Sequence, residues 1–197
     1  MSFTVTGLEK NEIIGNIPEN ARGSLSFAAE NATLIIGANV DFVNVHIYLE
    51  ANSTIMIANN CSLEGTLVTK ENCFLRIGES CQIVGRSRLN ADEGKSITIG
   101  KRCIIHAARF RTSDSHSVID VQTQQRINQA KNIELGDDVF VDRHCFFYKG
   151  ANIGAGSYVS IGSIVTRVLP ANSLIAGQPA QAVRENVAWL QQESTLG

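Results

Sequence analysis

Residues 135–165 read LGDDVFVDRHCFFYKGANIGAGSYVSIGSIV, and within this stretch a large apolar residue returns at every sixth position. The repeating positions are Leu135, Val141, Phe147, Ile153 and Val159, and an earlier set is Ile77, Ile83 and Leu89. Successive side chains of a strand point to opposite faces. One inward apolar residue per six therefore predicts short strands that are separated by corners.

A longer period organises these strands into coils. An aliphatic residue followed by small and polar residues recurs at Ile36, Ile57, Ile77, Ile99, Leu135 and Ile153, at separations of 21, 20, 22, 36 and 18 positions. Eighteen is the unit, with small insertions, and 36 is two units. Three strands per unit predict a triangular all-β solenoid whose coils stack about 4.8 Å apart and cover one another.

Small residues mark the corners and the interior of this solenoid. Residues that tolerate left-handed backbone angles follow the repeated aliphatics, namely Gly37, Gly78, Gly100, Gly136, Gly154, Asn39, Asn59 and Asn60. Cys61, Cys81 and Cys103 occupy one position of successive coils, which predicts a column of buried structural thiols. The chain has five cysteines and no CxxC pair, so neither a disulfide framework nor a zinc knuckle is expected.

Composition excludes several classes of protein. The 197 residues are 44% hydrophobic, which is enough for a folded domain with a core, and the formal net charge is −2. No dense basic run is present, so nucleic acid is not an expected partner. The sequence contains neither a signal-peptide pattern nor an uncharged apolar stretch of about 18 residues. We therefore expect a cytoplasmic protein without a transmembrane segment.

Three regions are expected along the chain. Residues 1–30 show faint periodicity and predict an N-terminal cap or an irregular first coil. Residues 31–180 form the solenoid, with a loop extruded over residues 111–132. Residues 181–197 predict a short C-terminal helix, over residues 183–192, that covers the open coil edge, followed by a tail.

The extruded loop is the candidate site because it is the longest break in the period and contains His116. Histidine is the side chain whose unperturbed pKa suits a general base near neutral pH. Asp114 and Asn90 are candidates to hold the second ring nitrogen, and the sequence does not choose between them. The alternative is that His116 is an ordinary surface residue.

The run from Leu135 to Arg167, together with Ala176-Gly-Gln-Pro-Ala and Ala182-Val-Arg184-Glu, resembles the hexapeptide-repeat acyltransferases over about residues 31–188. The resemblance implies a left-handed parallel β-helix, assembled as a homotrimer with acetyl-CoA sites between subunits. The loop motif Arg111-Thr-Ser-Asp-Ser-His116-Ser is most similar to sugar and capsular polysaccharide O-acetyltransferases, including the polysialic acid type.

The resemblance also implies roles for individual residues. Those expected to bind acetyl-CoA are Phe140, Tyr148, Ile161, Gly162, Thr166, Arg167 and Arg184. Family members usually carry Trp at the position of Phe140 and Gly at that of Asp142. Arg109, Arg111 and Ser115 flank the loop entrance and are expected to bind an anionic carbohydrate acceptor, although pairing of the arginines with Asp114 or Asp120 is the other interpretation. No metal ion is expected.

The favoured function is direct transfer of acetyl from acetyl-CoA to a sugar hydroxyl, with His116 as base. N-acetylation of an amino sugar or nucleotide sugar could use the same base. A zinc hydratase of this fold would need three histidines at one subunit junction, and the spacing of His106 and His116 does not favour it. A non-catalytic scaffold is the remaining alternative.

Overall fold

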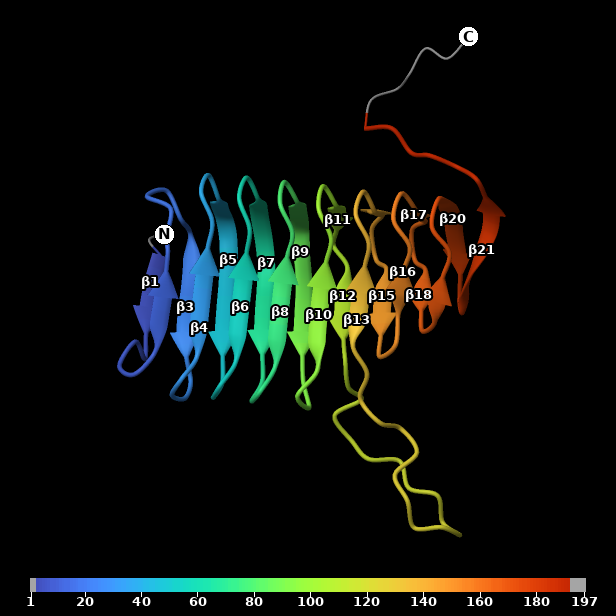
Figure 1. Cartoon of the computed structure of the whole chain (residues 1–197), viewed down its shortest axis with the longest axis horizontal. Helices are drawn as coiled ribbons and strands as arrows, with labels where there is room; N and C mark the ends of the chain where they lie inside the picture. The colour runs from blue at the N-terminus through green and yellow to red at the C-terminus, as the bar shows by residue number, and fades with distance from the viewer. Residues whose placement is uncertain (1–2, 192–197) are drawn as a thin grey trace.

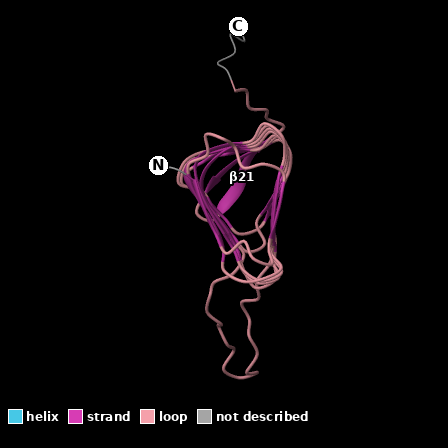
Figure 2. Cartoon of the chain, turned by 90° about the vertical axis from the view of Figure 1, so that its left-hand side faces the viewer, coloured by secondary structure: helices cyan, strands magenta, loops and turns pink. Residues whose placement is uncertain are grey.

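The computed structural model describes residues 3–191 and shows a three-sided rod of parallel strands (Figures 1 and 2). One face of the rod is a sheet of eight strands, one from each coil. These strands are β2 (Glu12–Ile14), β4 (Thr33–Ile36), β6 (Thr54–Ile57), β8 (Phe74–Ile77), β10 (Ser96–Ile99), β13 (Ile133–Leu135), β16 (Asn152–Ile153) and β19 (Val168–Leu169). The predicted all-β solenoid is confirmed.

A second sheet of thirteen strands wraps the other two faces. In the early coils single long strands cover both faces, namely β5 (Asp41–Leu49), β7 (Ser62–Thr69) and β9 (Gln82–Ala91). Later coils divide the same path into β11 (Ile104–His106) and β12 (Arg109–Arg111), β14 (Phe140–Val141) and β15 (Phe146–Tyr148), and β17 (Tyr158–Val159) and β18 (Ile164–Val165). The long strand β7 turns the corner at Gly65, where φ is +130° and a Cβ would lie 2.1 Å from the Ser87 carbonyl oxygen.

The inward apolar positions that the periods predict are buried. Residues in register on β4, β6, β8, β10 and β13 are all fully buried, namely Leu34, Ile55, Leu75, Ile97 and Ile133. The three predicted cysteines are buried as well. The thiols of Cys61, Cys81 and Cys103 donate to carbonyl oxygens of the next coil at 3.1, 3.0 and 3.2 Å. Their structural role is confirmed.

The reason for the glycines at the corners differs from the expectation. Gly100 does not have a left-handed φ; that conformation falls two residues later, at Arg102 (φ 54°). Glycine is needed at this position because a Cβ on Gly100 would lie 2.4 Å from backbone atoms of Gly136 in the next coil. Close stacking of coils, rather than chain reversal, selects glycine here.

The two ends of the rod close differently. At the N-terminus, β1 (Phe3–Thr6) and β2 pair in parallel with β3 (Gly23–Phe27) and β4. At the other end, β20 (Ser173–Gly177) is followed by β21 (Ala180–Glu185), which runs antiparallel to it.

The expected C-terminal helix is wrong. Residues 183–185 belong to β21 and residues 186–191 are not helical, while residue 192 lies outside the described residues. The helix was expected to cover the open edge of the last coil. Instead, β21 forms backbone hydrogen bonds with β20 and covers that edge as an antiparallel strand. Over residues 3–191 the structure has no helix long and apolar enough to cross a membrane.

Candidate functional site

The segment between β12 and β13 leaves the rod at one corner and projects away from it (Figures 1 and 2). Its base is fixed by Thr112, which directly follows β12 and is fully buried. Thr112 Oγ1 donates to the Asp92 carbonyl oxygen at 3.0 Å and accepts from the Asp92 amide at 2.8 Å. The returning chain meets the same residue, because the Lys131 amide donates to the Thr112 carbonyl at 3.1 Å. The loop therefore starts and ends at one anchored point.

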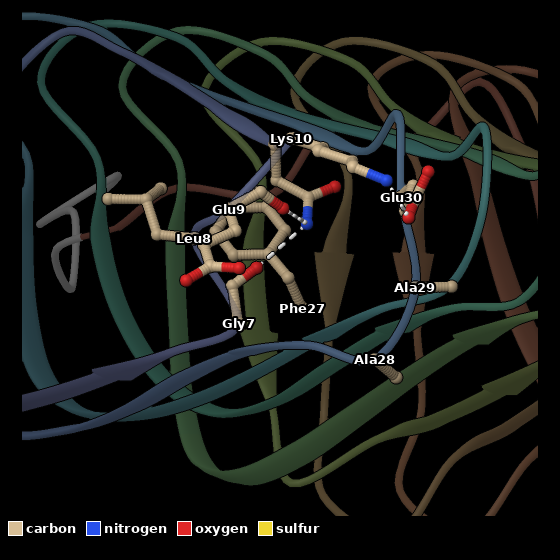
Figure 3. Close-up of a pocket in the computed structure, with 9 residues that line it drawn as sticks. Gly7, Leu8, Glu9, Lys10, Phe27, Ala28, Ala29 and Glu30 are labelled. Atoms are coloured by element: carbon tan, nitrogen blue, oxygen red, sulfur yellow. Dashed lines mark hydrogen bonds and ion pairs between the residues drawn. The ribbon is translucent and has the colours of Figure 1, made fainter.

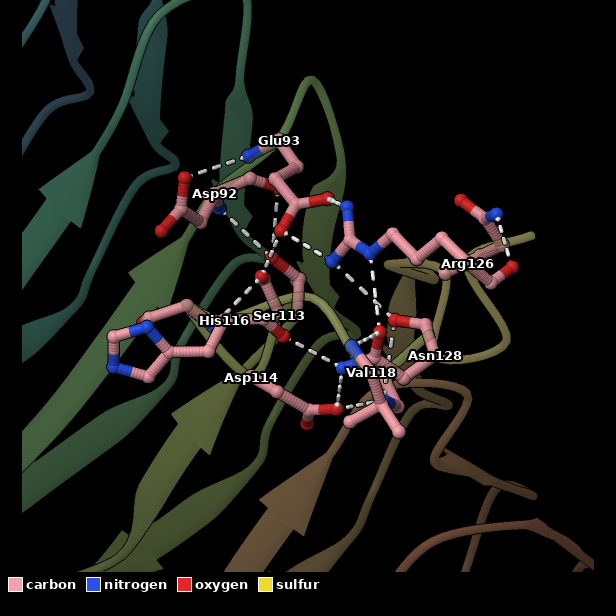
Figure 4. Close-up of polar contacts among 12 residues, drawn as sticks. Asp92, Glu93, Ser113, Asp114, His116, Val118, Arg126 and Asn128 are labelled. Atoms are coloured by element: carbon pink, nitrogen blue, oxygen red, sulfur yellow. Dashed lines mark hydrogen bonds and ion pairs between the residues drawn. The ribbon is translucent and has the colours of Figure 1, made fainter. Parts of the chain in front are cut away.

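Arg126, on the returning side of the loop, reaches back to Glu93 on the coil (Figure 4). Its Nη1 and Nη2 donate to the two carboxylate oxygens of Glu93 at 2.6 and 2.8 Å, and Ser113 Oγ donates to the same carboxylate. The Arg126 guanidinium, followed by Ser113, lowers the pKa of Glu93 to about 2. Because this pKa is depressed in the fold, the contact stabilises the loop above the ordinary glutamate pKa of about 4.3 and weakens as pH falls toward about 2.

Asp114 is held by a second set of contacts. Lys149, which follows β15, donates from Nζ to Asp114 Oδ2, and Asn128 Nδ2 donates to the same oxygen at 2.8 Å. The Lys149 ammonium is the main cause of a lowered pKa of Asp114. Asp114 is thus an ionised carboxylate at neutral pH and forms a salt bridge with Lys149.

His116 is exposed, and its ring points away from the Asp114 carboxylate (Figure 4). Its backbone is held, because Asn128 Nδ2 donates to the His116 carbonyl oxygen at 2.7 Å. In the part of the chain that the structure describes, no hydrogen bond joins the imidazole to Asp114 or to Asn90. Neither candidate orients the ring within a single chain.

A cleft of about 380 Å³ lies beside the loop, lined by Arg88, Asn90, Arg109, Phe110, Arg111 and Ser115. It brings together Asn90 and the three residues expected to bind the acceptor. Arg111 Nη2 donates to Ser115 Oγ at 2.6 Å. Asn90 Oδ1 is buried and has no hydrogen-bond partner among the described residues. A volume of this size is typical of small ligand sites.

The arginines of this cleft do not pair with the acidic residues considered from the sequence. Asp114 pairs with Lys149, and Asp120 accepts from the Gln122 and Thr123 amides of its own loop at 2.8 Å each. Within residues 3–191, none of the three arginines takes part in a salt bridge. Three guanidinium groups without a salt bridge in residues 3–191 make the cleft attractive to an anion.

Arg88 belongs to this cleft and was missed by sequence reasoning. It lies on β9 in register with Arg109 of the next coil, so both side chains stand on the same outward row. The signal was the coil period itself, because Arg88 precedes Arg109 by 21 positions.

Some of the expected cofactor residues continue this outward surface. Tyr148 is in register with Arg111, and Phe146, on the same strand, is in register with Arg109. Thr166 and Arg167 follow β18 as Lys149 follows β15, which puts all of them at one corner. Ile161 and Gly162 occupy the opposite corner, before β18. Ile161 is 62% exposed, and a Cβ on Gly162 would meet only Gln178 Nε2, at 3.9 Å.

Phe140 and Arg184 lie on a different face of the rod. Phe140 stacks on Tyr158 at a ring-centroid distance of 4.9 Å, and Trp189 packs against Phe140 at 5.3 Å. Trp189 Nε1 donates to the Asp138 carbonyl oxygen at 2.7 Å. Arg184 is exposed on β21, opposite Leu174, whose other register partner is Tyr158. The structure therefore does not gather all expected site residues around His116 of the same chain.

Two aromatic residues near Phe140 were not expected there. Tyr158 follows Phe140 by 18 positions, so the period could have placed it. The position of Trp189 beside Phe140 could not be predicted, because the sequence predicted a helix over a segment that is not helical in the structure. Tyr158 OH donates to Asp142 Oδ2 at 3.2 Å. This hydrogen bond holds the Asp142 carboxylate beside Tyr158, on the face of the rod that carries Phe140.

Another hollow lies at the N-terminal end and is lined in part by Gly7, Leu8 and Glu9 (Figure 3). At its rim Lys10 Nζ pairs with Glu30 Oε1 at 2.6 Å. It contains none of the expected site residues and lies far along the rod from the loop (Figure 1).

Two relatives found by sequence comparison are polysialic acid O-acetyltransferases, although no family model matches the chain. A polysialic acid O-acetyltransferase of Escherichia coli O1:K1 / APEC is 29% identical over 136 residues, which cover 68% of this chain and 44% of the relative. Less than half of that relative is therefore matched. One from Neisseria meningitidis is 28% identical over 169 residues, 84% of this chain and 78% of the relative.

Solved structures give the same result. The polySia-specific acetyltransferase NeuO has a TM-score of 0.90 at 26% identity, covering 99% of this chain and 89% of that one. The polysialic acid O-acetyltransferase OatWY has a TM-score of 0.88 at 26% identity, covering 100% and 95%. The fold of the rod is thus shared with these two structures.

Proposed function

We propose that this chain, which is similar to the polysialic acid O-acetyltransferases, transfers acetyl from acetyl-CoA to a hydroxyl of an acidic polysaccharide. The observation that carries the proposal is the cleft beside the His116 loop, where Arg88, Arg109 and Arg111 have no acidic partner in residues 3–191. Sugar carboxylates would supply the missing negative charge through charge-assisted hydrogen bonds.

His116 is assigned as the general base. A sugar hydroxyl is a weak nucleophile, and its oxygen attacks the acetyl carbonyl carbon as the imidazole takes its proton. The carbon–sulfur bond breaks, and the imidazolium returns the proton to the departing thiolate. Ser115 lines the adjacent cleft, so we assign the exposed ring of the following residue, His116, to an acceptor that is bound there. Asp114 and Asn90 remain proposed as members of the same centre.

The residues assigned to acetyl-CoA fit an extended donor. Ile161 and Gly162 leave an open corner beside which pantetheine could run, with Tyr148 on the neighbouring strand. Thr166 and the exposed Arg167 suit its phosphates. Phe140 and Arg184 also belong to the proposed donor site, and they lie on another face. A site shared between copies would unite the two faces, so we propose a homotrimer with acetyl-CoA between subunits.

The proposed location is the cytoplasm. All five cysteines are free and buried, which suits a reducing compartment, and acetyl-CoA is the proposed donor.

The function is tested by measuring release of free CoA thiol with three acceptors: polysialic acid, a neutral polysaccharide and an amino sugar. We expect acetyl-CoA consumption with the acidic polymer, ester formation at its hydroxyls and a higher melting temperature on addition of CoA. Acetylation of the amino sugar alone would indicate an N-acetyltransferase. Absence of both CoA binding and turnover would indicate a non-catalytic scaffold.

Arg109→Ala is expected to raise the KM for the acidic polymer about tenfold and to leave the KM for acetyl-CoA unchanged. The reason is loss of one charge-assisted hydrogen bond, worth about 1.5–3 kcal/mol. Initial rates at varied polymer concentration measure the effect. Arg76→Ala is the matched control, because Arg76 is an exposed arginine on β8, on the opposite sheet. Equal KM values for both variants would remove Arg109 from the acceptor site.

A further inference from the structure

Asn128 contacts the chain on both sides of His116 (Figure 4). Its Nδ2 donates to Asp114 Oδ2 at 2.8 Å and to the His116 carbonyl oxygen at 2.7 Å. Its Oδ1 accepts from the Val118 amide at 2.7 Å and from Arg126 Nε at 3.1 Å. A single amide side chain therefore fixes three alternate residues, 114, 116 and 118, of the outgoing half of the loop.

Lys149 connects this arrangement to the coil. It lies at the end of β15, and its side chain is only 22% exposed. Its Nζ donates to Asp114 Oδ2 and to the Asn128 carbonyl oxygen, the latter at 3.4 Å. The ammonium thus contacts the outgoing and the returning halves of the loop at the same point.

The imidazole has no such support of its own. Among the described residues no hydrogen bond reaches the His116 ring, so the position of the ring depends on its backbone. A base that is displaced by about 1 Å from its productive position can lose about 10²-fold in rate. Holding residues 114–118 in place is therefore a requirement of the assigned chemistry.

We propose that Asn128 and Lys149 are positioning residues that act through His116, with Asn128 bracing the loop backbone and Lys149 fixing that brace to the rod. The inference depends on the proposed function, in which His116 is the base. It assigns to Asp114 a role in the brace, as the carboxylate that Lys149 and Asn128 share.

The first test is Asn128→Asp. The substitution keeps the size of the side chain and the Oδ1 acceptor that binds the Val118 amide and Arg126, but it removes the Nδ2 donor and places a carboxylate against Asp114. We expect kcat to fall about 10- to 100-fold and the KM for acetyl-CoA to change less than about twofold, since the residues assigned to the donor lie on other elements. Gln125→Ala, an exposed residue of the same loop, is the control and should keep wild-type kcat.

The second test separates positioning from general stability. In the His116→Ala background, Asn128→Asp should cause almost no further loss of kcat, because there is no imidazole left to position. An equal further loss in that background would overturn the inference. A wild-type kcat for Asn128→Asp alone would overturn it as well.

Lys149 provides an independent measurement. Lys149→Met should lower kcat, while Lys149→Arg, which restores a cation at the end of β15, should recover most of the activity. Loss of activity in both, or in neither, contradicts the assigned role. A fully active His116→Ala variant would instead refute the base assignment, so failure of the function and failure of the inference are distinguishable.

Discussion

His116→Ala is expected to lower kcat by about 10²–10⁴-fold, which is the range that a positioned general base contributes. The KM for acetyl-CoA should stay near that of the wild type, because Thr166 and Arg167 follow β18, Arg184 lies on β21, and none of them belongs to the loop. The measurement is steady-state thiol release with saturating polysialic acid, on protein whose melting curve matches that of the wild type.

His46→Ala is the control for this substitution. His46 lies on β5 and its Nδ1 is 2.9 Å from Ser24 Oγ, several coils away from the loop. It should keep full activity. If His116→Ala keeps most of its activity, the surface interpretation of His116 is correct and another base must be sought.

The rod could be predicted from the sequence because its signal is repeated in every coil. An inward residue such as Leu75 or Ile97 packs against an inward aliphatic residue of the coil on either side. The same periodic pattern of apolar residues therefore predicts burial in every coil. The same regularity placed Cys81 and Cys103 in the interior. Prediction failed at the end of the repeat. Residues 183–185 pair as a strand because an open edge was available, and that edge is a tertiary feature that local sequence does not encode.

The candidate site was predictable only in part. Arg109, Arg111 and Ser115 were identified from their position at the loop entrance, and the structure places them in one cleft. Glu93 and Arg126 were not identified. They are 33 residues apart and no period relates them, so only the path of the loop brings them together. In the rod, the coil period predicts which residues contact each other. The loop does not follow this period, so its contacts cannot be predicted from sequence spacing.

Phe147→Ala is expected to reduce the free energy of unfolding by about 3–5 kcal/mol. Phe147 on β15 stacks on Phe110 of β12 at a centroid distance of 4.4 Å and an interplanar angle of 4°, and both rings are fully buried. Truncation leaves a cavity between two coils that a stacked solenoid cannot close without moving a strand. Denaturant unfolding at a fixed protein concentration measures the loss.

Phe146→Ala is the matched control, since Phe146 is the neighbouring residue on the outward face of the same strand and is only half-buried. It should cost about 1 kcal/mol, in the ordinary range for a partly exposed side chain. Comparable losses for the two variants would contradict the inward and outward assignment of β15. Phe147→Ala should also raise the KM for the acidic polymer, because β12, whose Phe110 stacks on Phe147, carries Arg109 and Arg111 on the face opposite the cavity. The buried stack thus holds the outward acceptor surface at its spacing, which links core packing to the proposed chemistry.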